Sequence, residues 1–400
     1  MLGPVAGHPV RLTLSALASP GRFCIFGSGT VTRKDLPMVS SRALSDSLPQ
    51  PLLCPDFGEP SSCLPKCRLD SKRYVTSRKL AKTLAGILQR QRKKACKLFL
   101  ECNPGPGILT QALLETGARV IALESDKTFI PHLESLGKNL NGRLEVVHCD
   151  FFKLDTKSGG LLRSPSMISQ MLFQNLGIEA RPWSAGVPLK VIGVFPFKSE
   201  RKALWKLLYD LYSCTSIYRY GRVELYMFIS EKEYQKLTAN PRKASLYQAL
   251  SVLWQVACNI KLLHVEPWSS FDVYTQSGQL EKPNPRESEL IQQNLYFIQM
   301  TPRKNLFTEN LTPINYDVFF HMLKQCFGKR NAKLIDHLSS LSAVDAMDVL
   351  TQAKKNDKVK ITNLYPQDFK NLFEIIEYSK DYTYKWVCND IMEEQNHIGK

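Results

Sequence analysis

Apolar and polar residues change period repeatedly from residue 71 onward. Short apolar runs bounded by Gly, Pro, Asn or Asp predict buried strands, and segments with apolar residues every three or four positions predict helices. The predicted strands are 97–102, 119–123, 144–148, 189–194 and 223–229, and the predicted helices are 108–115, 129–140 and 203–212. Strands that alternate with helices indicate an α/β fold with a doubly wound, mostly parallel sheet.

The pattern becomes helical after residue 303. Thr312 and Pro313 supply an N-cap and a first helical residue, and Gly328 can end the helix. The apolar face between them consists of Val318, Phe319, Met322, Leu323, Cys326 and Phe327. We therefore expect an α/β domain at 71–304, a small C-terminal helical subdomain at 305–386 and a tail at 387–400. A Ser- and Gly-containing insertion at 155–188 is a candidate mobile loop.

The N-terminal segment has a different composition. Residues 1–34 contain no Asp or Glu but carry Arg11, Arg22, Arg33 and Lys34 among Leu, Ser and Ala, which is typical of a mitochondrial transit peptide. The alternative is an unstructured tail that lacks acidic residues by chance. Residues 35–70 are rich in Pro, Ser and Cys without periodicity, so they are predicted to be a flexible linker.

The charge balance points to a polyanionic partner. The chain has 53 Lys and Arg against 37 Asp and Glu, a net charge of +16, and such an excess attracts nucleic acid through counterion release. Part of this charge belongs to the predicted targeting segment, and a solvated face without a partner is the alternative. No apolar run of about 18 residues occurs, so no membrane span is predicted.

Metal and hydrolase chemistry are disfavoured. The eleven Cys and seven His show no spacing that completes a zinc site, and no Ser or Cys lies in a nucleophile elbow. We expect reduced thiols and no bound metal.

A run of small residues follows the first predicted strand of the sheet. It includes Glu101, Asn103, Gly105 and Gly107 and opens a helix, which places glycine where backbone must approach a ligand closely. An ordinary Gly-rich turn is the alternative. However, the next strand ends about twenty residues later at Glu124, where a carboxylate can accept hydrogen bonds from ribose hydroxyls.

The third strand of this region ends at Asp150 and Phe151, which suit an adenine amino group and its flat face. Three consecutive strand ends therefore converge on one adenosine-like ligand. The glycines lack the spacing of dinucleotide-binding proteins and no Arg follows Glu124, so S-adenosylmethionine is favoured over NAD or NADP.

The segments 100–110, 124–126 and 149–151 resemble the first motifs of the rRNA adenine N6-dimethyltransferases, and the resemblance extends over about 71–385. It implies a Rossmann-like domain that binds S-adenosylmethionine. By this resemblance Val75 covers the cofactor and the Gly105 turn lies beneath its methionine part. Glu124 holds the ribose and Asp150 recognises the adenine.

The family binds its target adenine in an Asn-Leu-Pro-Tyr type motif, and this chain departs from it. The chain has Val194, Phe195, Pro196 and Phe197 instead. Phe197 can still stack on a base, but Val194 offers no acceptor for the target amino group. Losing one positioned hydrogen bond costs about 2–4 kcal/mol of barrier, so weak activity is expected. Glu231 at the family's Gln position and the altered segment 266–271 also disfavour the usual rRNA substrate.

Two basic groups are candidate nucleic-acid contacts. Lys198, Arg201, Lys202 and Tyr209 follow the base motif and combine charge with a ring that can stack on unpaired bases. Their neighbours Trp205 and Tyr212 fit such a path and a helix core equally well. The second group is Lys329, Arg330 and Lys333, for which helix-dipole complementation is the alternative. A surface extension over Tyr218, Arg219, Tyr220 and Arg222 is also expected. The cations of 90–97 are attributed to a solvated face.

These observations favour two functions. The resemblance to mitochondrial members of the family implies a transcription initiation factor of the matrix nucleoid, monomeric before assembly. Its implied partners are the mitochondrial RNA polymerase, promoter DNA that it melts, and the mitochondrial HMG-box transcription factor. The alternative is an active enzyme that dimethylates adenines of mitochondrial small-subunit rRNA. A small-molecule methyltransferase fits the charge excess poorly.

Overall fold

A computed structural model describes residues 72–90, 98–138, 140–156, 165–274, 280–281, 294–379 and 385–386. The predicted transit peptide 1–34, the linker 35–70, the tail 387–400 and most of the basic run 90–97 lie outside these residues. Among the residues described, no helix is long and apolar enough to span a membrane.

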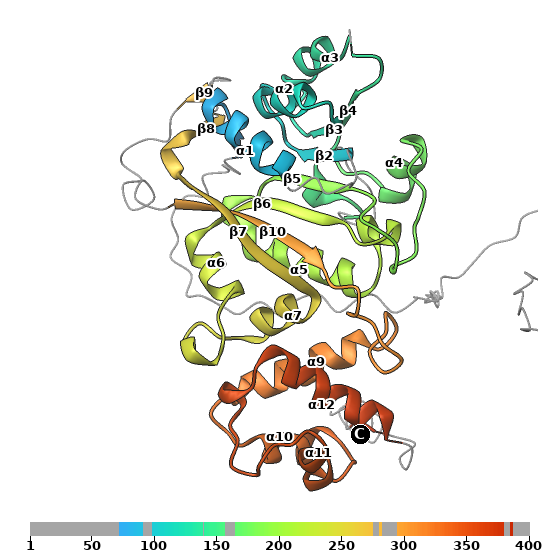
Figure 1. Ribbon diagram of the computed structural model, residues 1–400, viewed down its shortest axis with the longest axis vertical. Helices are drawn as coiled ribbons and strands as arrows, with labels where there is room; N and C mark the ends of the chain where they lie inside the picture. The colour runs from blue at the N-terminus through green and yellow to red at the C-terminus, as the bar shows by residue number, and fades with distance from the viewer. Residues whose placement is uncertain are drawn as a thin grey trace, which may run out of the picture. The chain divides into compact units, whose positions relative to one another are not determined.

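The central sheet has seven strands in the order β4-β3-β2-β5-β6-β10-β7 (Figure 1). The first five strands are parallel to one another, β10 pairs antiparallel with β6, and β7 pairs antiparallel with β10. Their bounds are β2 Leu98–Cys102, β3 Arg119–Glu124, β4 Leu144–His148, β5 Lys190–Val194, β6 Glu224–Ser230, β7 Cys258–Pro267 and β10 Asn294–Pro302. The predicted α/β fold with a mostly parallel sheet is confirmed. The strand order changes direction beside β2, which is where ligands bind in doubly wound sheets.

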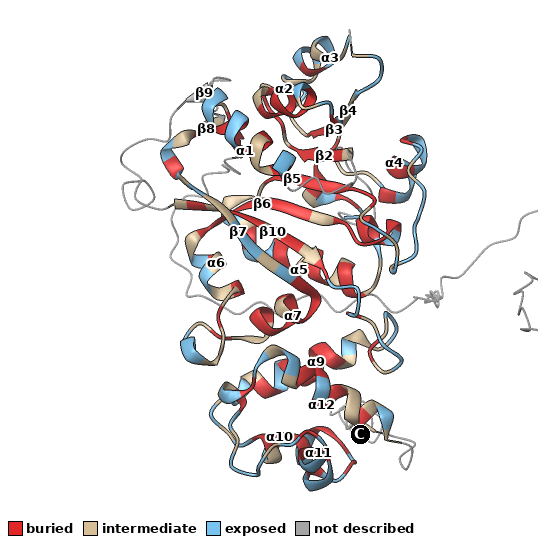
Figure 2. Ribbon diagram, in the orientation of Figure 1, coloured by how far each residue is buried: buried red, intermediate tan, exposed pale blue. Residues whose placement is uncertain are grey.

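Helices cover both faces of this sheet. They are α1 Arg78–Arg90, α2 Ile108–Glu115, α3 Ile130–Gly137, α4 Ser169–Asn175, α5 Glu200–Tyr212, α6 Glu231–Leu237 and α7 Ala249–Ala257. Successive strand side chains point to opposite faces, so Leu225 and Met227 of β6 join one apolar cluster while Tyr226 and Phe228 join the other. The inner strands β2, β3, β5 and β6 are accordingly almost entirely buried, whereas the edge strands β4 and β7 are only partly buried (Figure 2).

A second, small sheet holds the N-terminal end of the described chain. Its order is β1-β8-β9, with β1 at Arg73–Val75, β8 at Phe271–Tyr274 and β9 at Leu280–Glu281. β1 runs antiparallel to β8, and Arg73 lies opposite Val273. The sequence analysis did not predict this sheet, because three-residue strands carry too little periodicity to detect.

The C-terminal part is helical, as predicted. It contains α9 Tyr316–Gly328, α10 Leu334–Leu341, α11 Ala346–Gln352 and α12 Pro366–Tyr378. The predicted start at Thr312 and Pro313 was wrong. Asn315 is the N-cap residue of α9, and its side-chain oxygen accepts hydrogen bonds from the backbone N–H and hydroxyl of Thr312. Thr312 therefore shapes the turn before the helix rather than capping it.

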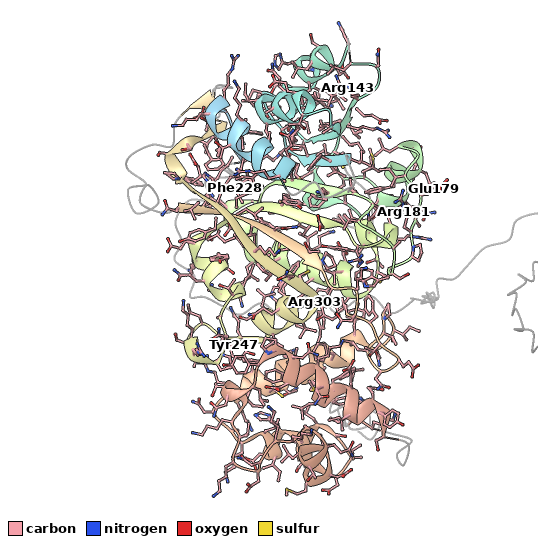
Figure 3. The ribbon with its side chains drawn as sticks, viewed as in Figure 1. Arg143, Glu179, Arg181, Phe228, Tyr247 and Arg303 are labelled. Atoms are coloured by element: carbon pink, nitrogen blue, oxygen red, sulfur yellow. The ribbon has the colours of Figure 1, made fainter. Side chains whose placement is uncertain are left out.

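Hydrogen bonds connect these helices to the α/β part. The buried Tyr247, labelled in Figure 3 just before α7, donates its hydroxyl to the carbonyl of Leu364 at 2.8 Å. The buried Lys370 ammonium donates to the carbonyl of Asn305 at 2.8 Å. α7 also packs against both α9 and α12, so one apolar core continues from the sheet into the helical part.

Residues 165–188 of the insertion between β4 and β5 contain a helix. This helix is α4, whose Leu172 and Phe173 are buried in the main core. The Phe173 ring stacks on Tyr220 with 4.4 Å between ring centroids. This aromatic contact fixes the segment, and it could not be read from the polar composition of the insertion.

Candidate active site

The Gly105 turn follows β2 and requires residues without a Cβ atom. Gly105 and Gly107 have φ angles of 58° and 74°, in the left-handed region. A Cβ atom on Gly105 would overlap the ring of Tyr74, and one on Gly107 would lie 2.8 Å from Leu136. The two glycines therefore let the turn pack closely against Tyr74, Leu133 and Leu136, and ligand binding at this turn stays a prediction.

Glu124 braces this turn from the end of β3. One oxygen of its carboxylate accepts the Gly105 N–H at 2.8 Å and the other accepts the Asp126 N–H at 2.7 Å. The side chain is fully buried, and burial raises the pKa of Glu124 above its ordinary value, opposed by these hydrogen bonds. The Ser125 hydroxyl also lies 3.5 Å from one carboxylate oxygen. A carboxylate has about four acceptor positions, so about one further donor can still be accommodated.

Polar side chains extend this network toward β1. The Ser125 hydroxyl donates to the Asn103 side-chain oxygen, and the Lys72 ammonium donates to the Ser125 hydroxyl. Asn103 itself has a left-handed φ of 49°. The predicted residues Asn103, Gly105 and Glu124 are thus brought together in one cluster.

Glu101 has a different surrounding. It is buried within β2 and its carboxylate accepts the Thr110 hydroxyl at 2.7 Å. Burial raises its pKa to about 8, so a proton is retained at neutral pH. The structure places this predicted cofactor residue at the base of α2, where it supports the turn from behind.

Asp150 ends β4 and caps the short 3-10 helix Phe151–Lys153. Its carboxylate accepts the Phe152 N–H at 3.1 Å and lies 3.6 Å from the Lys153 ammonium. The prediction that Phe151 would face an adenine was wrong, because its ring is buried in the core. Phe152 is the partly exposed ring at this strand end, and it contacts Phe195 with centroids 5.6 Å apart. Both aromatic residues were visible in the sequence, but not which of them turns inward.

The altered base motif lies at the end of β5, the neighbour of β2. The Phe195 N–H donates to the carbonyl of Phe228 at 2.9 Å, which fixes the backbone of the motif. Val194, Pro196 and Phe197 are partly exposed.

The Phe197 ring is covered from β1. The Arg73 guanidinium carbon lies 4.1 Å from its centroid, and the Trp268 ring is 5.5 Å away. Val75, two residues further along β1, pairs with Phe271 and is buried among α1 and α2. Neither Arg73 nor Trp268 was predicted from the sequence to contact Phe197.

The first basic group is exposed beside this motif. Lys198, Arg201 and Lys202 are exposed at the start of α5. Arg201 donates to the Gln248 side chain at 2.7 Å. Tyr209 is half-buried and its ring contacts Trp205 and Phe320.

Its aromatic neighbours serve the core. Tyr212 is fully buried and donates its hydroxyl to the Leu253 carbonyl at 3.0 Å, so it is a core residue and not a nucleic-acid contact. Trp205 is half-buried and packs against the main core.

The second basic group borders segment 244–248, which Arg201 of the first group also contacts. Lys329 and Lys333 are exposed, and the Arg330 guanidinium donates to the carbonyl of Ala244. Because Arg201 contacts Gln248, both groups border the segment 244–248. The preceding residues Arg242 and Lys243 are exposed and were missed by the sequence analysis. We define the basic strip by its members: Lys198, Arg201, Lys202, Arg242, Lys243, Lys329, Arg330 and Lys333.

The expected surface extension was wrong for Tyr218, Tyr220 and Arg222, whose side chains are buried. Arg219 is exposed and donates to the Gln170 side chain at 3.3 Å. The Arg222 guanidinium donates to the backbone carbonyls of Trp183 at 2.8 Å and Ala185 at 2.6 Å. This arginine holds the loop before β5 in place and does not face solvent.

The polar groups at this edge fit an adenosine-type cofactor. Glu124 and Asp150 are carboxylates at neighbouring strand ends, acceptors that suit ribose hydroxyls and an adenine amino group, while the Tyr74 ring lies against Gly105. In the described part of the chain, no group of three or more His, Cys, Asp or Glu side chains is placed to hold a metal ion.

A family model described as ribosomal RNA adenine dimethylase matches residues 69–378. The chain therefore belongs to the ribosomal RNA adenine dimethylase family. The methyl donor of this family is S-adenosylmethionine, so the predicted cofactor is confirmed at family level.

Mitochondrial relatives resemble the chain over nearly their whole length. The chain is 61% identical over 393 residues to the human protein named mitochondrial dimethyladenosine transferase 2, covering 98% of this chain and 99% of the relative. The bovine protein of the same name is 58% identical, with 98% of each chain covered. The solved structure of a dimethyladenosine transferase from Plasmodium falciparum is 16% identical, with a TM-score of 0.49 over 75% of this chain and 95% of that one.

Proposed function

We propose that this chain is a transcription initiation factor of the mitochondrial matrix and nucleoid. It works with the mitochondrial RNA polymerase, together with the mitochondrial HMG-box transcription factor, to melt promoter DNA and stabilise the open strands. The chain is a monomer before this assembly. The mitochondrial names of its relatives support the location.

The basic strip is the observation that carries this proposal. Its cations come from three separate parts of the chain, and Arg201 and Arg330 both contact the segment 244–248. Cations gathered in this way can follow a phosphate backbone, and the half-buried Tyr209 and Trp205 lie on the helix that carries Arg201 and Lys202. The binding needs no base-modifying chemistry.

The second candidate is dimethylation of adenines in mitochondrial small-subunit rRNA, favoured by the intact cofactor edge. S-adenosylmethionine, when bound, supplies an electrophilic methyl group. The Gly105 turn, Glu124, Asp150 and Phe152 would hold it at the strand ends. At the neighbouring β5, Val194 cannot accept a hydrogen bond from the target amino group, so the amine is poorly oriented and transfer is slow.

A run-off assay with mitochondrial polymerase tests the two functions, using linear and pre-melted promoter templates. We expect initiation to require this chain on the linear template and much less on the pre-melted one. Replacing the exposed Arg242, Lys243, Lys329 and Lys333 with Ala should weaken promoter binding. The slope of the logarithm of the binding constant against the logarithm of the salt concentration should become less negative by about one for each lost phosphate contact.

The control is the exposed pair Lys79 and Lys82 of α1, replaced with Ala. Methyl transfer to a small-subunit rRNA hairpin is measured in parallel. Strong transfer without any effect on initiation would contradict the proposal and favour the enzyme. Equal loss of binding in the α1 control would show that net charge, not the basic strip, is responsible.

A further inference from the structure

The short strand β1 brings Arg73 to the altered base motif. β1 is anchored by pairing with β8, where Arg73 lies opposite Val273 and Val75 opposite Phe271. Trp268 belongs to the 3-10 turn Trp268–Ser270, directly before β8. The pairing therefore places Arg73 and Trp268 side by side, although they are far apart in the sequence.

The Arg73 side chain is enclosed by two aromatic rings. Its guanidinium carbon lies 2.9 Å from the Trp268 centroid and 4.1 Å from the Phe197 centroid. Arg73 is 5% exposed and Trp268 4%, so water is largely excluded from this contact. A desolvated guanidinium on aromatic faces is a strong cation–π contact.

A carboxylate complements the charge of this arginine. Glu200, at the start of α5, is buried and accepts hydrogen bonds from the N–H and hydroxyl of Ser230. Its pKa is raised to about 7, mainly by burial, while the nearby charge of Arg73 acts in the opposite direction. The arginine thus belongs to a formed buried site.

The location of this contact matters because Phe197 is the ring available for stacking on a base. A guanidinium is planar and covers the ring face against which a base would lie. We propose that Arg73 occupies the target-base site of this chain and excludes an extruded adenine. Loss of methyl transfer then has two causes, the missing acceptor at Val194 and the occupied ring face. This inference rests on the proposed function, in which the chain binds nucleic acid without methylating a base.

Base entry can be measured without polymerase or promoter, so it is decided separately from the role in transcription. The probe is a small-subunit rRNA hairpin with 8-azidoadenine at the target position, photo-cross-linked to the full chain and mapped by peptide. In the unaltered protein we expect no cross-link within 194–197. In Arg73→Ala the yield there should rise at least about tenfold. Arg78→Ala, an exposed arginine of α1, is the control and should resemble the unaltered protein.

Methyl transfer gives a second readout. Val194→Asn alone should raise labelled-methyl transfer less than about twofold, because the ring face remains covered. Combined with Arg73→Ala, the rise should be at least about tenfold, and adding Phe197→Ala should abolish the gain.

Two outcomes would overturn the proposal. One is a cross-link to 194–197 in the unaltered protein, which decides the question even if Arg73→Ala fails to fold. The other is a folded Arg73→Ala variant, checked by thermal unfolding, that admits no base.

Discussion

Two neighbouring parts of one sheet edge carry side chains of different chemistry in this molecule. At the ends of β3 and β4, Glu124 and Asp150 are carboxylates that accept hydrogen bonds from backbone N–H groups of the adjoining turns. At the end of β5, Val194 has no polar side-chain atom, and the Phe197 ring is covered by Arg73. The predicted cofactor side carries carboxylates, while the predicted base side carries an aliphatic side chain and a ring covered by a guanidinium.

The difference follows from what each side chain does for the fold. Removing the Glu124 carboxylate would leave the Gly105 and Asp126 N–H groups without their acceptor, and an unsatisfied buried donor costs about 1–3 kcal/mol. An acceptor at position 194 would serve only a substrate, so the fold loses nothing without it. The Glu124 carboxylate is therefore needed by the fold itself, whereas an acceptor at position 194 is not.

The largest expected effect is a loss of stability on substitution in the Gly105 turn. Gly105→Ala adds a Cβ atom that overlaps Tyr74 at a left-handed φ of 58°, so we expect the free energy of unfolding to fall by about 3 kcal/mol. Urea unfolding measures the loss. Gly117→Ala is the matched control, because φ is 75° there but nothing lies within 4 Å; it should cost about 1 kcal/mol. Equal losses of stability in both variants would show that overlap with the Tyr74 ring is not the cause.

A pH-dependent effect sharpens the comparison at the base of α2. Burial raises the pKa of Glu101 from 4.5 to about 8, so the folded chain keeps a proton that the unfolded chain releases above about pH 4.5. The folded state therefore loses stability as pH rises from about 4.5 to 8.

Glu101→Gln removes this loss. Relative to the unaltered protein, it should gain about 2–4 kcal/mol at pH 8 and almost nothing at pH 4.5. Urea unfolding across this pH range provides the measurement, with the exposed Glu115→Gln as control. A gain that does not vary with pH would show that Glu101 is not protonated in the fold.

The smallest effect separates the two aromatic residues at the end of β4. Phe152→Leu should weaken S-adenosylmethionine binding about three- to tenfold with little change in stability, because this ring is partly exposed. Phe151→Leu should lower the free energy of unfolding by about 1 kcal/mol and leave the affinity unchanged, because its ring is in the core. Calorimetric titration and urea unfolding distinguish them, and the opposite assignment would restore Phe151 as the adenine contact.

Element boundaries were predictable where periodicity is strong. The strand predicted at 144–148 is β4, Leu144–His148, and the helix predicted at 108–115 is α2, Ile108–Glu115. α5 begins at Glu200 and not at 203, because its first turn carries charged residues that hide the apolar period. The charged edge strand β7 also escaped prediction, since several of its side chains are exposed and its pattern is mixed.

The sequence by itself determined the alternation of helices with strands β2 to β6 and indicated candidate cofactor residues at three strand ends. Both depend on local patterns: glycine after one strand and a carboxylate at the end of each of the next two, which parallel pairing brings to one edge. Only the tertiary structure decided which aromatic ring turns inward, which cations gather beside segment 244–248, and that Arg73 lies on Phe197. These facts depend on contacts between distant segments, and such contacts leave no periodic signal in the chain.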